Sequence, residues 1–467
     1  MFYLGSRVKK DRSLEVISPY DGKIVERVGI SEADDIQRAI ETARLGNEKL
    51  KRLPTGERAA ILRRSGEIIG KRREEFARTL ALEVGKTIKE ARGEVDRCIN
   101  TLNLSAIAAM ELSGETVNFD LFGKSRKVGF YKRVPVGITV AISPFNFPLN
   151  LVAHKLGPSV AAGNGIILKP ASKTPLSGIM LAEVLVEAGL PKEAITVLIG
   201  SGREIGEPLV SHPEVRLVTF TGSLEVGKRI AHLAGLKKLV MELGSNSGVI
   251  IWKDGDLSRA AKRIRLGGYA LAGQVCISVQ RVYVEESVAA EFLEIFQKEV
   301  ESIRFGDPLR EETEMGPMIT EDAARNAEGL VAEAVEMGGE LKTGGRRNFT
   351  MFEPTILFNV PEDARVMREE AFAPIVVVNP VRSLDEAITR MNNSVYGLQA
   401  GVYTRDLGVA FRCLEELDAG GVLINEIPTF RVDNMPYGGM KGSGLGREGP
   451  KFAIEEHTEI KLMIIDR

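Results

Sequence analysis

Hydrophobic side chains in the first quarter of the chain recur at the spacing of an α-helix. The pattern is clearest in SEADDIQRAIETARL, GERAAILRRSGEIIGKRREEFARTLALEVG and EARGEVDRCINTLNLSAIAAMEL, all within residues 31–112. Apolar positions three or four residues apart lie on one face of a helix. Residues 31–112 are therefore predicted to be helical, and Cys98 belongs to the predicted apolar face as a core residue.

From about residue 134 the pattern changes to short β-branched runs separated by helical segments or Gly/Pro turns. The runs in 134–245 are GITVAIS, GIILKP, AITVLIG, VRLVTF and KLVMEL. A second set occupies 246–430, with SGVIIW, SVQRVYVEE, APIVVVNPV, LQAGVYT and GGVLIN. Strands that alternate with helices indicate mostly parallel, doubly wound sheets. The predicted fold class is α/β, with two doubly wound α/β domains.

Two segments fit neither set. KSRKVGFYKRVPVG at 124–137 and HTEIKLMIID at 457–466 both alternate like exposed strands. Free strand edges usually pair with another strand, often from a second chain. We therefore expect a small β arm at a subunit contact, in a homodimer or a homotetramer.

Composition narrows the class of protein. At 467 residues the chain is too long for one core, and its 44% hydrophobic and 27% charged residues are ordinary for a globular protein. The 62 Lys and Arg against 64 Asp and Glu give no general attraction to nucleic acid or to anionic lipid. Neither a membrane helix nor a signal-peptide core is recognisable. We expect a cytoplasmic protein with no nucleic-acid or membrane partner.

The three cysteines are widely spaced. Cys98, Cys276 and Cys413 form no CxxC motif and no Cys/His cluster, so neither a disulfide framework nor a metal site is predicted. Cys276 lies among small residues in GGYALAGQVCISVQRVYVEE, where a helix-like segment turns into a strand. There it could face a substrate channel as a nucleophile, with local dipoles favouring its thiolate. The alternative is a small buried hydrophobe.

Three polar residues follow strand-like runs. Asn146 in SPFNFPLN could donate to a developing oxyanion, although Asn before Phe-Pro is also ordinary turn chemistry. Lys169 ends GIILK, at the sheet edge where parallel strands bind nucleotides, and suits ribose hydroxyls or a phosphate. Glu242 ends KLVMEL and could act as a general base toward water, or be a surface charge.

Glycines mark two strand-to-helix turns, GSGREIG at 200–206 and VTFTGSLEVGKRIA at 218–231. Backbone amides at such a helix start can face a pyrophosphate. Neither segment has the GxGxxG pattern, so each alone is a weak sign of dinucleotide binding.

Taken together, the order and spacing of these segments resemble the aldehyde dehydrogenase superfamily over essentially the entire chain. The matching motifs are SPFNFP, LKPASKTP, FTGS followed by Gly227, ELG at 242–244, GQVC, EEAFAP and NMPYGGMKGSGLGREG. The resemblance implies thiolate attack on an aldehyde, hydride transfer to NAD(P), and hydrolysis of the thioester. It also implies an NAD(P)-binding domain at 1–112 and 134–245, a catalytic domain at 246–443, and an oligomerisation arm at 113–133 and 444–467.

On that resemblance, Cys276 is the nucleophile, Glu242 is the general base, and Asn146 shares the oxyanion hole with the Cys276 backbone amide. Lys169 and Glu370 would hold the two riboses. The residues expected to bind the cofactor are Ser143, Pro144, Phe145, Lys169, Ser172, Lys173, Gly202, Arg203, Gly206, Phe220, Gly222, Ser223, Leu243, Glu370 and Phe372.

Three positions depart from the family pattern. Ala373 replaces the usual glycine of EEAFAP, and Phe145 replaces a common tryptophan. Ser172 stands where NAD-preferring members commonly carry a glutamate, so repulsion toward a 2'-phosphate is absent. Lys173 and Arg203 beside it make NADP acceptable on charge grounds. Both NADP and NAD remain open as the cofactor.

The substrate side is less informative. NEIPTFRVDNMPYGG and ELGSNS resemble the branch of lactaldehyde, phosphonoacetaldehyde and non-phosphorylating glyceraldehyde-3-phosphate dehydrogenases. A small, hydroxylated or anionic aldehyde is expected, with Arg97, His154 and Arg431 as candidate sources of positive charge, although each could be a packing or surface residue. Glu242 favours a free acid as product. The alternatives are a CoA-acylating aldehyde dehydrogenase and a catalytically silent cofactor-binding protein of the same fold.

Overall fold

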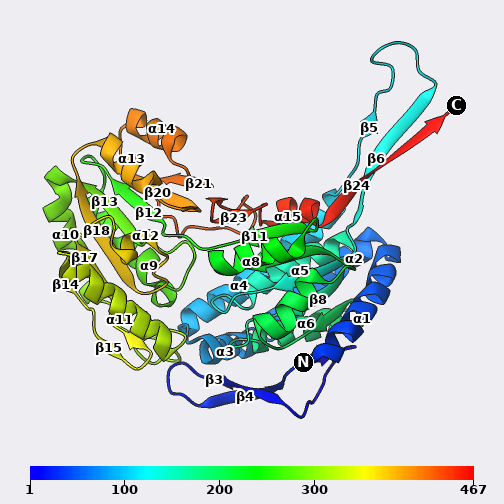
Figure 1. The fold of residues 1–467 in the computed structure, drawn as a ribbon, viewed down its shortest axis with the longest axis horizontal. Helices are drawn as coiled ribbons and strands as arrows, with labels where there is room; N and C mark the ends of the chain where they lie inside the picture. The colour runs from blue at the N-terminus through cyan, green and yellow to red at the C-terminus, as the bar shows by residue number, and fades with distance from the viewer.

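The computed structural model describes all 467 residues and contains two large sheets flanked by helices, with an arm that projects from the body (Figure 1). The first sheet has eight strands in the order β2-β1-β9-β8-β7-β10-β11-β23. Its parallel centre is β7 (Ile138–Ile142), β8 (Gly165–Lys169), β9 (Ile195–Val197), β10 (Val215–Thr221) and β11 (Lys238–Glu242). Its antiparallel edges are β1 (Phe2–Tyr3), β2 (Ser6–Arg7) and β23 (Gly444–Leu445).

The helices of the first half cover this sheet. Every residue of α5 (Asn150–Ala162) is buried, including the polar or charged residues Asn150, His154, Lys155 and Ser159. The predicted helical region 31–112 is confirmed, and Cys98 is fully buried in the core. The other helices here are α1 (Ala33–Arg52), α2 (Thr55–Lys71), α3 (Arg73–Val84), α4 (Ile88–Glu111), α6 (Leu176–Glu187), a π-helix (Gly202–Gly206), α7 (Glu207–Ser211) and α8 (Leu224–Ala234).

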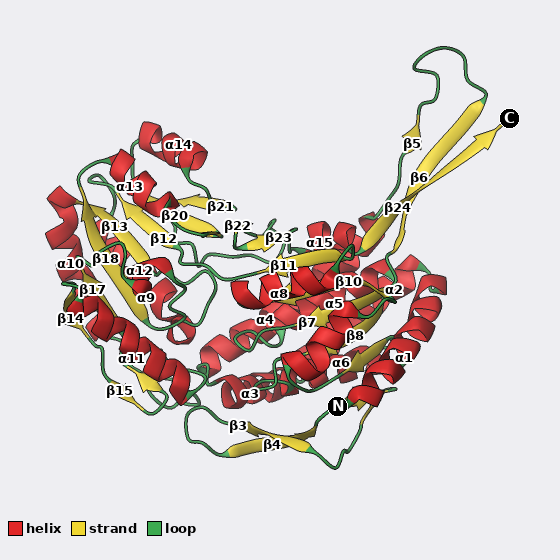
Figure 2. Cartoon of the chain, in the orientation of Figure 1, coloured by secondary structure: helices red, strands yellow, loops and turns green.

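The second sheet has seven strands in the order β14-β17-β18-β13-β12-β20-β21, with helices on its faces (Figure 2). The strands are β12 (Gly248–Ile251), β13 (Arg281–Glu285), β14 (Glu340–Thr343), β17 (Thr355–Phe358), β18 (Ile375–Val381), β20 (Gln399–Tyr403) and β21 (Gly421–Ile424). Only β14 runs antiparallel to its neighbour. The α/β class with two mostly parallel sheets is confirmed.

The helices of this half and the short strands complete the element list. The helices are α9 (Leu257–Tyr269), a 3₁₀ turn (Ala270–Gly273), α10 (Glu286–Glu301), α11 (Glu321–Glu336), α12 (Arg365–Arg368), α13 (Leu384–Asn392) and α14 (Leu407–Glu416). The short pairs are β3 (Ser13–Ile17) with β4 (Ile24–Gly29), β15 (Arg347–Asn348) with β16 (Met351–Phe352), and β19 (Tyr396–Gly397) with β22 (Met440–Lys441). None of the helices combines the length and apolar character needed to cross a bilayer.

The projecting arm is a three-stranded sheet (Figure 1). β6 (Lys127–Pro135) lies between β5 (Thr116–Val117) and β24 (Thr458–Asp466), antiparallel to both. The two segments expected to be exposed strands therefore pair with each other. Residues 444–457, expected in the arm, instead return to the body: β23 pairs with β11, and α15 (Pro450–Glu456) packs on α4 and α5. Ala453 and Ile454 are buried there, which holds α15 to the body.

A buried ion pair holds the segment that leads into α5. Glu94 of α4 accepts hydrogen bonds from the backbone N–H groups of Leu149 (2.9 Å) and Asn150 (3.0 Å), and pairs with the fully buried Lys86. The Lys86 ammonium lies 4.0 Å from the centre of the Phe147 ring. Removing one partner of such a pair leaves an uncompensated buried charge.

Glu94→Ala is therefore expected to lower the free energy of unfolding by about 3–5 kcal/mol, measured by urea denaturation. The matched control is Asp96→Ala on the same helix, because Asp96 forms an exposed pair with Arg73. That change is expected to cost less than about 1 kcal/mol. Equal losses in the two variants would contradict the assignment of Glu94 as an internal anchor.

Candidate active site

A cavity of about 770 Å³ opens at the carboxyl ends of the first sheet's parallel strands. Lys169 is the last residue of β8 and Thr221 the last residue of β10, and both line it. Cys276 and Glu370, which come from the other half of the chain, line it as well. Ligands of open parallel sheets bind at this edge. The cavity is thus placed to hold a ligand against Cys276.

Thirteen of the fifteen residues expected to bind a cofactor line this cavity. They are Ser143, Pro144, Phe145, Lys169, Gly202, Arg203, Gly206, Phe220, Gly222, Ser223, Leu243, Glu370 and Phe372. Ser172 and Lys173 do not line it. The Ser172 hydroxyl donates to the carbonyl of Gly200 (2.8 Å), and Lys173 is exposed. The short serine therefore fixes the neighbouring loop and does not reach the cavity.

Several lining residues were not singled out in the sequence. Val226 and Ile230 lie four residues apart on α8, and their apolar spacing is a signal that could have identified this face. Arg229 also lines the cavity and forms an exposed ion pair with Glu207 (2.9 Å). The remaining ones are Ile142, Leu151, Ala171, Glu207, Thr221, Glu225 and Gly244.

Two glycines permit close approach in the cavity wall. A Cβ on Gly222 would lie 2.4 Å from Cζ of Phe220, and one on Gly244 would lie 2.5 Å from Oε2 of Glu370. Gly222 precedes Ser223, whose side chain caps the first turn of α8. The free backbone N–H groups of that turn and the helix dipole favour an anionic group. This end of the cavity is therefore suited to a phosphate.

One cation and one carboxylate face the same cavity. Lys169 is buried without an acidic partner, and burial lowers its pKa to about 8. Glu370 accepts a hydrogen bond from the backbone N–H of Ser245 (3.0 Å), and burial raises its pKa to about 7. A buried donor and a half-buried acceptor of this kind suit a ligand rich in hydroxyl groups.

Strained backbone carries Cys276 to the cavity. Leu271 (φ 48°), Ala272 (φ 52°) and Gly273 (φ 70°) are consecutive left-handed residues. A Cβ on Gly273 would lie 2.0 Å from the carbonyl oxygen of Ala373, so only glycine fits. Strain of this kind is typical of functional sites.

The sulfur of Cys276 is a thiol in its resting environment. Cys276 is half-buried, and loss of solvation at its sulfur raises its pKa to about 12. The hydroxyl of Tyr437, 3.1 Å from Sγ, and the nearby Arg431 act in the opposite direction. A nucleophilic cysteine in this environment requires groups that stabilise its thiolate.

Asn146 and Cys276 share the cavity wall. One hydrogen of the Asn146 amide is donated to the carbonyl of Gln274 (2.8 Å), and its Oδ1 accepts from the N–H of Phe147 (3.1 Å). These bonds fix the orientation of the amide, and its second hydrogen remains available to a ligand.

Glu242 is buried, and neither carboxylate oxygen has a hydrogen-bond partner. Burial, and then the charge of Glu448, raise its pKa well above the usual range, while Arg431 and Lys155 act against them. Unlike Cys276 and Asn146, Glu242 does not line the cavity. An unpartnered buried carboxyl is costly for a fold and is a candidate proton acceptor.

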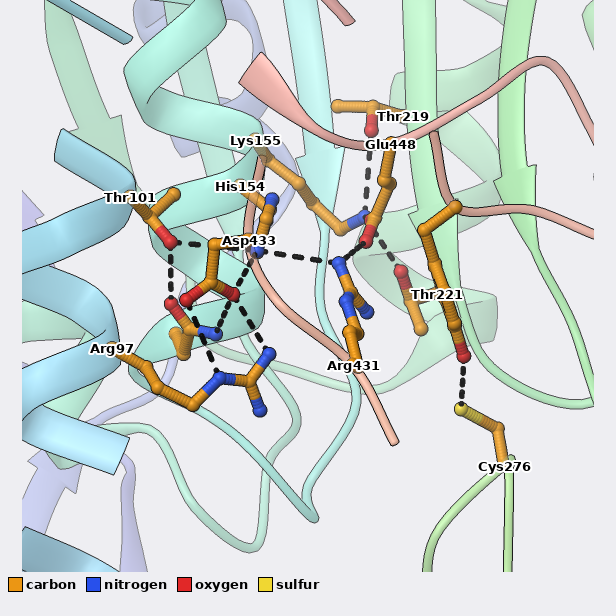
Figure 3. A network of polar contacts seen from close by, with 12 residues as sticks. Arg97, Thr101, His154, Lys155, Thr219, Thr221, Cys276, Arg431, Asp433 and Glu448 are labelled. Atoms are coloured by element: carbon orange, nitrogen blue, oxygen red, sulfur yellow. Dashed lines mark hydrogen bonds and ion pairs between the residues drawn. The ribbon is translucent and has the colours of Figure 1, made fainter. Parts of the chain in front are cut away.

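The three residues expected to supply positive charge come together in one network (Figure 3). Arg97 (2.8 Å) and His154 (3.1 Å) contact Asp433, and Arg431 contacts Glu448 (2.9 Å). Burial, then Arg431, lower the pKa of His154, which favours its neutral form. None of the three lines the cavity. Both arginines therefore have carboxylate partners within the chain, and only Arg97, with a side chain 32% exposed, keeps a partly free guanidinium.

Comparison with known proteins gives one consistent result. Residues 7–463 match the model of the aldehyde dehydrogenase family. The chain is 44% identical to a 3-sulfolactaldehyde dehydrogenase of Priestia megaterium, covering 97% of this chain and 95% of that protein. It is 39% identical to a lactaldehyde dehydrogenase of Methanococcus maripaludis, covering 100% and 99%.

Among solved structures, the glyceraldehyde-3-phosphate dehydrogenase GapN of Methanocaldococcus jannaschii, complexed with NADP, is similar at a TM-score of 0.94. The two chains are 39% identical, and the match covers 98% of this chain and 100% of that one. Other similar structures hold NAD+.

Proposed function

Because the chain belongs to the aldehyde dehydrogenase family, we propose that it oxidises a small, hydroxylated or anionic aldehyde to the free carboxylate by covalent catalysis on Cys276. NAD(P)-dependent aldehyde oxidation is the activity of this family, and the cofactor is NADP or NAD. The observation that carries the proposal is the single cavity that Cys276 and Asn146 share with Lys169 and Glu370.

The cavity fits a dinucleotide in three respects. Gly222 and Gly244 let the side chains of Phe220 and Glu370 pack closely into the cavity wall. The first turn of α8 faces the cavity, and Lys169 and Glu370 offer a donor and an acceptor. We assign Lys169 and Glu370 to the ribose hydroxyls and the α8 turn to the pyrophosphate. A bound NAD(P) supplies the hydride acceptor.

The chain's own residues divide the remaining work. The Cys276 thiolate attacks the aldehyde carbon to give a thiohemiacetal, whose oxyanion accepts hydrogen bonds from the Asn146 amide and the Cys276 backbone N–H. Loss of hydride from that carbon leaves a thioester on Sγ. Glu242 then takes a proton from water, the resulting hydroxide attacks the thioester, and the carboxylate leaves as the Cys276 sulfur is released.

The cofactor preference is proposed from Arg203. It lines the cavity, whereas Ser172 offers no carboxylate to repel a 2'-phosphate and Lys173 is exposed outside it. Arg203 is therefore the cation we assign to the 2'-phosphate of NADP. NAD stays acceptable because nothing in the cavity requires that phosphate.

The network around Asp433 and Glu448 affects which class of aldehyde we propose as the substrate. The similar dehydrogenases act on lactaldehyde, 3-sulfolactaldehyde and glyceraldehyde 3-phosphate, all small and hydroxylated. Asp433 and Glu448 already compensate Arg97 and Arg431, so a strong cationic site is not formed by this network. We place hydroxylated aldehydes first, and we keep Arg97 as the contact for an anionic group because its guanidinium is partly exposed.

The test is turnover by the purified protein with NAD or NADP and a panel of lactaldehyde, glyceraldehyde 3-phosphate and succinate semialdehyde. Reduced cofactor is expected to form without coenzyme A, with a higher kcat/KM for the two hydroxylated aldehydes. A strict requirement for coenzyme A would overturn the hydrolytic route. Cofactor binding without any turnover would support a catalytically silent protein.

The affinity for NAD is expected to be highest between pH values of about 7 and 8, the pKa values of Glu370 and Lys169. Binding favours charged Lys169, so affinity falls as pH rises above about 8. Binding equally favours ionised Glu370, so affinity falls as pH drops below about 7. NAD is used because the 2'-phosphate of NADP itself titrates near pH 6, with a pKa of about 6.

Calorimetric titration at several pH values measures this effect. In Lys169→Met the alkaline decrease should disappear, and in Glu370→Gln the acidic decrease should disappear. A parent protein whose affinity does not change across this range would rule out direct contact of either side chain with the cofactor.

The arm supports a proposal of self-association. β24 is the edge strand of the arm sheet, and Ile460, Leu462 and Ile464 on it are exposed apolar residues. Edge strands of this kind are usually covered by another chain. We propose that the arm makes a contact between subunits in a homodimer or homotetramer.

A further inference from the structure

The sulfur of Cys276 has one polar side-chain partner, the hydroxyl of Tyr437, at 3.1 Å. Tyr437 is almost completely buried, and this contact is the only hydrogen bond that its hydroxyl makes. A buried phenol normally finds a hydrogen-bond partner. Here the partner is the sulfur of Cys276, the proposed nucleophile, and the mechanism above gives Tyr437 no role.

A guanidinium lies on the face of the same ring. The central carbon of Arg431 is 3.7 Å from the centre of the Tyr437 ring. Glu448 fixes Arg431 through an ion pair of 2.9 Å, and Glu448 is itself paired with Lys155 (3.4 Å). A cation over an aromatic face is stabilised by the ring electrons and withdraws electron density from them. The hydroxyl of such a tyrosine is a stronger hydrogen-bond donor.

The remaining charged groups near the sulfur act against its ionisation. Glu370 and Glu242 both disfavour a negative charge on Cys276, and burial disfavours it most. Tyr437 and Arg431 are the two groups that favour it. A hydrogen bond from Tyr437 therefore stabilises a negative charge on Cys276 that burial and the two glutamates disfavour.

We propose that Tyr437 is a catalytic residue that donates its hydroxyl hydrogen to the Cys276 thiolate, and that Arg431 is a positioning residue that strengthens this bond from the ring face. The proposal rests on the proposed role of Cys276 as the nucleophile. The thiol proton leaves to solvent and the phenol keeps its own proton. The same bond stabilises the sulfur again when the thioester is hydrolysed and the thiolate departs.

The test is the pH dependence of Cys276 alkylation by iodoacetamide, followed by mass spectrometry of the peptide that contains Cys276. Cys98 and Cys413 are buried and lie on other peptides. Tyr437→Phe is expected to move the profile to higher pH by about one to two units, since a hydrogen bond to a charged group is lost. At a fixed pH below the thiol's pKa, each unit of that shift lowers the fraction of thiolate about tenfold. The more basic thiolate is also more nucleophilic, which offsets part of this loss, so alkylation should be about three- to tenfold slower per unit.

Tyr403→Phe is the matched control. Tyr403 is buried in the second sheet and its hydroxyl has no hydrogen-bond partner, so this variant should leave the alkylation profile in place. Arg431→Lys should shift the profile in the same direction as Tyr437→Phe but less far, because the charge is kept and the planar stack is lost. This second variant tests the proposal if Tyr437→Phe fails to fold.

Two results separate failure of this inference from failure of the proposed function. An unchanged or lowered thiol pKa in Tyr437→Phe overturns the inference, because the tyrosine would then accept the thiol hydrogen or contribute packing alone. Full turnover by protein carbamidomethylated at Cys276 overturns the nucleophile assignment, whatever Tyr437→Phe does to the profile.

Discussion

Replacing Cys276 by serine is expected to reduce kcat for aldehyde oxidation by about 10⁴-fold or more, the scale seen when a nucleophile that forms a covalent intermediate is removed. A serine hydroxyl fits the same space, but it ionises far less readily than a thiol in a pocket that already raises the cysteine pKa to about 12. The measurement is steady-state reduction of the cofactor with the best aldehyde of the panel. Cofactor affinity should not change, because the substitution removes no volume from the cavity.

Cys413→Ser serves as the control for that substitution. Cys413 is buried on α14, within the second core and away from the cavity lining. Its replacement should leave kcat within about twofold, since it touches no proposed catalytic group. Comparable losses in both variants would indicate damage to the fold and would remove the support for Cys276 as the nucleophile.

Replacing Glu242 by glutamine is expected to separate the two halves of the reaction. Glutamine keeps the shape of the side chain but cannot accept a proton from water, so the thioester should form and then hydrolyse slowly. Loss of a general base usually costs about 10²–10⁴-fold. We therefore expect a burst of about one reduced cofactor per active site, followed by a steady state slower by that factor, measured by rapid mixing.

The pH profile gives a second signature of the same residue. Burial, and then Glu448, raise the pKa of Glu242. Only its ionised form accepts a proton, so the parent kcat should rise with pH as this carboxyl ionises. In Glu242→Gln that rise should be absent. Glu369→Gln, an exposed residue paired with Arg365, should keep both the rate and the profile of the parent.

The parts of the fold that sequence patterns predicted are those whose burial follows a regular period. Every residue of β7 and β8 is buried, so both appear as unbroken apolar runs. β17, with the sequence TILF, was not among the predicted strands, although β12 and β21 have the same length of four residues and were predicted. β23 has only two residues, too few to show a period, and its pairing with β11 is a contact between segments about 200 residues apart.

The site was predictable where a motif fixes the backbone and less so where side chains meet across the chain. Position 222 must be glycine because a Cβ there would collide with Phe220, two residues earlier in the same strand-to-helix motif. The contact between Cys276 and Tyr437 joins positions 161 residues apart, and no local pattern encodes it. The same holds for Ser172, whose hydroxyl turns to a loop carbonyl instead of the cavity.

Arg97 and Arg431 show that tertiary contacts, which the sequence does not reveal, decide whether a cation can bind a substrate. Read alone, Arg97 and Arg431 are cations free to bind an anionic substrate. In the folded chain Asp433 and Glu448 compensate them, and Arg431 is committed to the ring of Tyr437. The net charge that these arginines offer to a ligand depends on their ion pairs with Asp433 and Glu448, which only the folded chain forms.

The most direct test of covalent catalysis on Cys276 is mass spectrometry of Glu242→Gln mixed with aldehyde and NAD(P), digested after the burst. The prediction is one acyl group, with the mass of the aldehyde less its transferred hydrogen, on the peptide that contains Cys276, together with one equivalent of reduced cofactor. Repeated turnover with no adduct on that peptide, or an adduct on another residue, would contradict it.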